Sequence, residues 1–213
     1  NKAKILKIQN KALELSMFLS LPASIALVIG SEEIISALFG YGSFNNEAVS
    51  NSAKALFYFS LGLPAFGLIK VFSTFFFANH DTKTPFYISL IAVTLNVLVS
   101  VYYFKSIGFI IIPIATTFSS WFNAVLLFIF LKNRDLFNLN KTFLVKFLKI
   151  LFASIFMGIF FNFVLSIFKN ELIYDYKFKS LYLILSVSLG LIFYIILSYL
   201  IKAFNSKDLQ LKY

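Results

Sequence analysis

Long apolar blocks separated by short polar stretches dominate this sequence. An α-helix rises about 1.5 Å per residue, so roughly twenty apolar residues cross the hydrocarbon core of a bilayer. The sequence therefore predicts an all-α, polytopic membrane helix bundle of about six transmembrane helices. The expected spans are Leu15–Gly30, Ala55–Ala78, Phe86–Phe104, Ile107–Leu131, Ile150–Phe168 and Leu181–Ile201.

Composition excludes a soluble enzyme. Hydrophobic residues make up 60% of the chain and charged residues 13%, whereas about a quarter of a soluble domain is charged. The absence of cysteine excludes disulfides and thiol catalysis. The single histidine, His80, lies in a polar loop, where a local hydrogen bond or a helix cap is expected rather than chemistry. No catalytic group or enzymatic activity is predicted.

The basic residues are distributed unevenly between the two predicted sides of the membrane. Thirteen of the nineteen lie on the side that holds both chain ends, five lie on the other side, and Lys70 lies inside a span. By the positive-inside rule, both termini are expected in the cytoplasm. The net charge of +10 is thus explained by membrane insertion, and no nucleic-acid partner is predicted. Because the chain starts at Asn1, we expect it to be part of a longer protein.

Local signals predict two helix boundaries. The first helix is expected to continue past Glu32 and Glu33 toward Phe39. The polar loop Asn79–Lys83 ends at Thr84, which suits an N-cap, and Pro85 suits the first helical position.

Lys70 is the one ionisable residue predicted well inside a span. It lies eight residues before the expected helix end at Ala78, or about 12 Å at 1.5 Å per residue. A lysine at that depth either extends its ammonium toward the interface or faces a polar cavity. In the second case Lys70 would attract an anionic group of a substrate.

Polar residues of the third and fourth spans are predicted at matching depths. Asn96 precedes the expected turn at Ser106 by ten residues, and Thr116 follows it by ten. Ser100 and Ile112 each lie six residues from the same turn. Because the two helices run antiparallel, each pair is expected at one level of the membrane, the first near the midplane.

Two interpretations of this polar stripe remain open. The fourth span also carries Ser119, Ser120 and Asn123, and small polar residues allow transmembrane helices to pack and hydrogen-bond. Pro113 lacks a backbone N–H, so a carbonyl one turn back is available to a ligand. The stripe is therefore either a packing interface or a site for a cation or a substrate.

Four segments together resemble the MurJ/MviN-type lipid II flippases. They are Leu38–Phe44, Leu61–Val71, Phe77–Pro85 (which contains the family's Asp-Thr-Lys-Thr-Pro pattern) and Gly108–Arg134. The segments occur in the order and spacing of that family over roughly residues 15 to 135. The last two spans agree in number and position but not in motif.

The resemblance implies a place in a larger architecture. Members of this multidrug/oligosaccharidyl-lipid/polysaccharide exporter superfamily have fourteen helices, and this chain would correspond to the ninth to fourteenth. Residues 1–135 would form four helices of the second transporter lobe. Residues 136–213 would form two additional C-terminal helices that help to make a lipid-facing groove.

The resemblance also implies a function and a ligand. The expected substrate is the undecaprenyl-pyrophosphate-linked peptidoglycan precursor, which would cross the bacterial inner membrane by alternating access. Membrane lipids are expected as further partners. Asn96, Ser100, the carbonyl of Ile112 and Thr116 fall where the ligands of a monovalent cation, sodium, would be, although Ser100 replaces an expected acidic residue. No other cofactor is expected. The alternatives are a related exporter of drugs or other lipid-linked sugars, and a membrane assembly subunit without transport activity.

Overall fold

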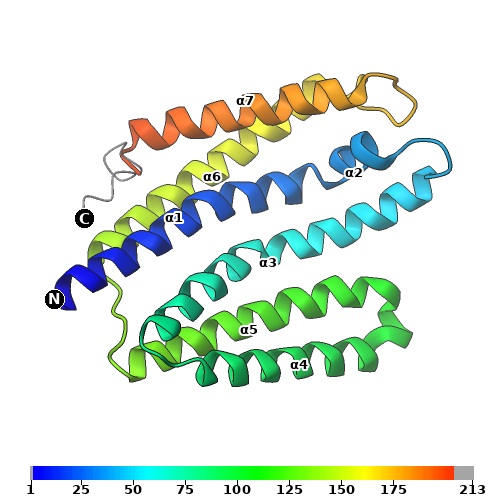
Figure 1. Cartoon of the computed structure of the whole chain (residues 1–213). Coiled ribbons are helices and arrows are strands. Elements are labelled where there is room, and N and C mark those ends of the chain that lie inside the picture. Colours follow the sequence, from blue (N-terminus) through cyan, green and yellow to red (C-terminus); the bar gives the residue numbers. More distant parts are fainter. Residues whose placement is uncertain (1, 204–213) are drawn as a thin grey trace. The chain divides into compact units, whose positions relative to one another are not determined.

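The computed structural model describes residues 2–203, and every regular element in that range is helical (Figure 1). The elements are α1 (Lys2–Ile29), α2 (Ser31–Phe39), α3 (Asn46–Ala78), α4 (Lys83–Ile107), the short 3₁₀ helix η1 (Gly108–Ile110), α5 (Ile111–Asn133), α6 (Lys141–Ile167) and α7 (Lys179–Leu200).

Five stretches of the described chain are long and apolar enough to cross a membrane. The longest, Lys83–Asn133, has 51 residues and contains both α4 and α5. These two helices have 25 and 23 residues, so each is long enough to span a bilayer alone. The structure confirms the predicted polytopic helical fold.

The α4–η1–α5 segment is an antiparallel hairpin whose helices lie side by side (Figure 1). The chain reverses at Gly108, where φ is 74°. Residues other than glycine rarely adopt this conformation, so Gly108 allows the chain to reverse two residues beyond the predicted turn centre at Ser106.

Contacts divide the chain into two compact units. Of the described residues, unit 1 contains 2–20 and 62–147, and unit 2 contains 21–61 and 148–203. The boundaries between the units fall within α1, α3 and α6. The division after residue 135 implied by the resemblance concerns transporter lobes, and it stays a prediction.

The core of unit 1 is rich in phenylalanine. The ring of Phe137, which lies in the connection between α5 and α6, is 5.5 Å from that of Phe75 and 6.1 Å from that of Phe72. Aromatic pairs at such distances add to the stabilisation that burial alone provides. This cluster holds the end of α3 against the end of the α4–α5 hairpin.

Polar side chains of α1 hold the start of α6 within unit 1. The buried Asn10 donates to the carbonyl of Asn138 at 3.0 Å and accepts from the backbone N–H of Asn140 at 3.1 Å. Lys146 forms an ion pair with Glu14 at 2.8 Å.

Unit 2 depends on small residues where helices approach one another. A Cβ atom on Gly158 of α6 would lie 2.5 Å from a methyl carbon of Ile25 on α1, so glycine permits this contact.

After one turn residue at Gly30, α2 continues from α1 to Phe39, which agrees with the predicted extension.

The predicted start of α4, with Pro85 as the first helical residue, was wrong by two residues. Helix α4 begins at Lys83, and its capping acceptor is the side chain of Asp81, which accepts the N–H of Thr84 at 3.0 Å. Pro85 lies inside the first turn and not at the first position. A proline is tolerated there because the first four N–H groups of a helix have no partner within it.

Three helices, α3, α5 and α7, end in hydrogen-bonded turns that place a non-glycine residue in the left-handed conformation. At the end of α3, His80 has φ of 59°, and Asp81 N–H donates to the carbonyl of Phe76 at 3.0 Å. Asp135 has φ of 53° at the end of α5, where Leu136 N–H donates to Leu131 at 3.1 Å. After α7, Lys202 has φ of 53°, and Ala203 N–H donates to the carbonyl of Ser198 at 2.9 Å. All three turns are Schellman motifs. His80 therefore acts in a cap, as the sequence predicted.

Candidate functional site

The polar face between α4 and α5 brings Asn96 and Thr116 together. The Asn96 amide donates to the Thr116 hydroxyl at 3.0 Å and to the Ser119 hydroxyl at 3.2 Å. These bonds confirm that Asn96 and Thr116 lie at one level. They also show that the polar stripe contributes to helix packing.

Ser100 and Ile112 each bond within their own helix and not with one another. Ser100 Oγ donates to Asn96 Oδ1 at 3.3 Å. The Ile112 carbonyl accepts the Thr116 hydroxyl at 2.8 Å. The carbonyl that Pro113 leaves without its usual helical partner is that of Phe109, four residues earlier, so Ile112 is not freed by the proline.

A cavity of about 420 Å³ opens beside these residues within unit 1. Apolar side chains of α3 and α4 form part of its wall, among them Phe66 and Ile69. Its polar lining consists of Asn96, Thr116, Ser119, Ser120 and Asn123. The cavity thus extends along α5 beyond the four residues predicted as cation ligands.

The hydrogen bonds of this lining leave mainly acceptors free. The hydroxyl groups of Ser119 and Ser120 donate to the Thr116 carbonyl, at 3.0 and 2.7 Å. Asn123 Oδ1 is buried and has no hydrogen-bond partner among the described residues. Since most donor hydrogens are already engaged, the remaining capacity of the cavity suits a cation or a donor group.

The lining contains neutral oxygen ligands and no carboxylate. Carbonyl, hydroxyl and amide oxygens suit hard cations, but a neutral set binds them more weakly than one with a carboxylate. Across residues 2–203, no three His, Cys, Asp or Glu residues lie close enough to hold a metal. The residues present therefore fit a weakly held monovalent ion better than a transition metal.

Lys70 lies elsewhere on α3. It is exposed, and it is not one of the residues that line the cavity, although its neighbour Ile69 is. Lys70 and the Asn96 group therefore do not form one site within unit 1.

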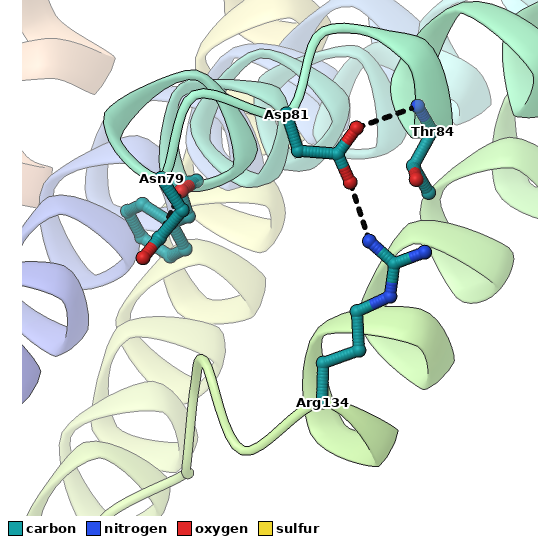
Figure 2. A network of polar contacts seen from close by, with 5 residues as sticks. Asn79, Asp81, Thr84 and Arg134 are labelled. Atoms are coloured by element: carbon teal, nitrogen blue, oxygen red, sulfur yellow. Dashed lines mark hydrogen bonds and ion pairs between the residues drawn. The ribbon is translucent and has the colours of Figure 1, made fainter.

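An ion pair joins the two ends of the hairpin at its open end (Figure 2). Arg134, directly after α5, forms an ion pair with Asp81, which lies two residues before α4. The bonds from Thr84 and then the Arg134 guanidinium stabilise the carboxylate and lower the pKa of Asp81 from 3.8 to about 2. Asn79, the other polar residue of this turn, donates to the carbonyl of Phe75 at 2.8 Å.

In the sequence, Asp81 belongs to the Asp-Thr-Lys-Thr-Pro pattern, and Arg134 is one of the basic residues on the side that holds both chain ends. Their proximity could have been found from the hairpin register. If Asn96 is level with Thr116, then Asp81 is level with Leu131, within one turn of Arg134.

A family model described as "Lipid II flippase MurJ" matches residues 1–183. The chain belongs to the MurJ family of lipid II flippases. This match confirms the resemblance drawn from the four segments. Together with the membrane-length helices, it also confirms that this is a multi-pass bacterial membrane protein.

Relatives described as "Probable lipid II flippase MurJ" extend this match. The protein of Rickettsia prowazekii is 30% identical over 206 residues, covering 93% of this chain and 39% of the relative. The Thermotoga maritima protein is 34% identical, covering 88% of this chain and 36% of the relative. The chain thus spans roughly two fifths of the length of these relatives.

A solved structure has the same fold. It is titled "Lipid II flippase MurJ, inward closed conformation", and it matches with a TM-score of 0.75 over 94% of this chain and 40% of the other. The sequence identity is 22%, so the likeness concerns the fold alone.

Proposed function

We propose that this chain is the C-terminal part of a flippase that moves lipid II, a lipid-linked peptidoglycan precursor, from the inner to the outer leaflet. The observation that carries the proposal is the family match over residues 1–183. The membrane-length helices and the polar cavity within them are features that transport across a bilayer requires. No covalent bond is made or broken in this reaction.

The transport cycle would use alternating access, in which two global conformations expose the substrate to opposite leaflets. A cation can bias such an equilibrium only by binding one conformation more tightly than the other. Asn96, Thr116 and the Ile112 carbonyl would supply oxygens to sodium, with Ser100 bound to Asn96 beside them. A sodium ion usually needs about five or six oxygens, so the rest of the full-length protein would complete this set.

The orientation follows from the charge distribution. Both termini, the α3–α4 turn and the α5–α6 connection would lie in the cytoplasm, because most basic residues lie near them. Lys70 would face an aqueous cavity of the full-length protein and attract the diphosphate of the substrate. The α6–α7 pair would contact the undecaprenyl chain and membrane lipids.

The test uses the full-length protein in proteoliposomes that contain labelled lipid II. We expect outward movement of the label that is lost when the protein is omitted or heat-inactivated. Movement of a lipid-linked sugar without the peptide, at an equal or higher rate, would instead favour a related exporter. Absence of movement for every lipid-linked substrate, combined with restored growth of flippase-depleted cells, would favour an assembly role.

A further inference from the structure

The first residue of α7 is a lysine buried completely inside unit 2. The exposed fraction of Lys179 is 0%. Its ammonium donates to the carbonyl of Gly40 at 2.6 Å and to the carbonyl of Tyr174 at 2.6 Å. It also lies 4.3 Å from the ring centre of Tyr41 and 4.5 Å from that of Tyr174.

This environment is unusual because buried lysines normally pair with a carboxylate. Among the described residues, no carboxylate lies within ion-pair distance of Lys179. The cation is held instead by carbonyl oxygens and the faces of two tyrosine rings, both of which attract positive charge. Such a site holds the cation in one place, because leaving it would strand two buried carbonyls.

The position of Gly40 explains how the ammonium reaches the end of α2. Gly40 is the C-cap of α2, where carbonyls lack helical partners and the helix dipole is negative. A Cβ atom at this position would lie 2.6 Å from the Ser36 carbonyl oxygen and 3.1 Å from the Tyr174 ring. Only glycine leaves space for this arrangement.

Further bonds join the same two segments. The Tyr174 hydroxyl donates to the Phe44 carbonyl at 2.7 Å. The Ser180 hydroxyl donates to the Ala37 carbonyl at 2.8 Å and lies 2.7 Å from the Tyr41 hydroxyl. We use the name Lys179 clasp for the side chains of Tyr41, Tyr174, Lys179 and Ser180 with the carbonyls they bind.

We propose that Lys179 is a positioning residue of the transporter: it fixes the start of α7 against the turn after α2, and transport requires that position. The observations that carry this are the complete burial of a cation and its bonds to both segments. The role in transport rests on the proposed function. Because α6 and α7 would contact the lipid chain, their placement determines where that chain lies.

The test compares Lys179→Met with Lys169→Met in the full-length protein. Met retains the length of the side chain and loses the cation, while Lys169 is an exposed lysine of the connection that precedes α7. Spin labels at Leu38 and Leu181, both exposed and both in unit 2, report the distance between α2 and α7. The second measurement is the rate of lipid II movement in proteoliposomes.

We expect a broader or longer distance distribution and a transport rate at least about tenfold lower for Lys179→Met, the effect of losing one charge-assisted hydrogen bond. Lys169→Met should match the wild type. Lys179→Arg, which retains the cation, should recover part of both signals. If Lys179→Met does not accumulate, Tyr41→Leu is measured in its place. It removes one aromatic face from the ammonium, and it should show a smaller change of the same kind.

An unchanged distance distribution in Lys179→Met would overturn the clasp. A changed distribution with wild-type transport would overturn its role in transport. If the wild type moves no lipid II, the proposed function fails, while the distance measurement still decides whether Lys179 positions α7.

Discussion

The side-chain amide of Asn96 donates a hydrogen bond of 3.0 Å to the hydroxyl of Thr116 and thereby joins α4 to α5 inside the apolar part of the hairpin. In lipid, such a bond has no competing water, although measured contributions are still only about 0.6 kcal/mol on average. The pair therefore adds more to the register of the hairpin than to its stability. It also forms one wall of the cavity in which we propose a cation.

Sodium is expected to raise the thermal stability of the full-length protein. A ligand at a hundred times its dissociation constant adds about 2.7 kcal/mol to the free energy of unfolding. Asn96→Ala and Thr116→Val should lose the sodium-specific part of the shift in melting temperature, measured against potassium and choline. Thr94→Val is the matched control, because Thr94 is exposed on α4 and bonds only its own helix carbonyl at Leu90. Equal shifts for all three cations in the wild type would contradict the site.

Asp81 predicts a pH dependence at the open end of the hairpin. The pKa of Asp81 falls from 3.8 to about 2 on folding, first because of its bonds with Thr84. A lowered pKa stabilises the folded state fully above the unfolded value, and this contribution is lost as the pH falls from about 4 to about 2. The difference in melting temperature between wild type and Asp81→Ala should therefore be constant from pH 7 to pH 5 and shrink by pH 2. Asp175→Ala, at an exposed carboxylate of the α6–α7 connection, is measured in parallel as the control.

The substitution Asp81→Asn separates the two roles of Asp81, which accepts the N–H of Thr84 and forms the ion pair with Arg134. Asp81→Asn retains an acceptor for the N–H of Thr84 and loses the ion pair with Arg134. Loss of a capping acceptor costs about 1 kcal/mol, whereas exposed ion pairs contribute little. Asp81→Asn should therefore be closer to wild type than Asp81→Ala. The reverse order would show that the ion pair dominates.

Left-handed residues at helix ends give a prediction of increased stability. Asp135 has φ of 53° after α5, a conformation that costs a side-chain-bearing residue about 1 kcal/mol and that glycine adopts freely. Asp135→Gly should raise the free energy of unfolding by about 0.5 kcal/mol. The control Asn133→Gly, at the last residue of α5, should lower it by a few tenths of a kcal/mol. Unfolding in a detergent–denaturant titration measures both, and a gain for Asn133→Gly would contradict the argument.

The hairpin could be predicted from sequence because its information is local and periodic. Apolar blocks determine the spans, and antiparallel counting from a short turn placed Asn96 level with Thr116. The predicted boundary at Thr84 was wrong because the sequence alone does not show which side chain accepts the first N–H groups of the helix, and only the path of the chain shows that Asp81 accepts the bond.

Lys179 could not have been found in this way. In the sequence it is one of five lysines on the side with fewer positive charges, and nothing nearby indicates burial. Its site is formed by Gly40, 139 residues earlier, and by Tyr174 in an irregular connection. Such contacts depend on where α2 and α7 meet, which no periodicity encodes.

Membrane orientation can be tested with single cysteines, because the chain has none of its own. We expect a membrane-impermeant thiol reagent to label Ser43→Cys and Asn170→Cys from outside the cell. Thr82→Cys and Leu139→Cys should react only after the membrane is opened. All four positions are exposed in the structure, so a difference in labelling reports the side of the membrane and not burial. The opposite pattern would reverse the orientation derived from the lysines and arginines.

The role of Lys70 is tested by growth of cells depleted of their native flippase. If its ammonium attracts an anionic substrate group, Lys70→Ala in the full-length protein should reduce growth, and Lys70→Arg should largely restore it because the charge remains. Lys54→Ala is the control, since Lys54 is an exposed lysine in the polar first turns of the same helix, α3. Membrane levels of each variant are measured in parallel. Full growth with Lys70→Ala at normal membrane levels would show that the Lys70 ammonium only extends to the interface. Removal of a group that binds the substrate should instead decrease transport.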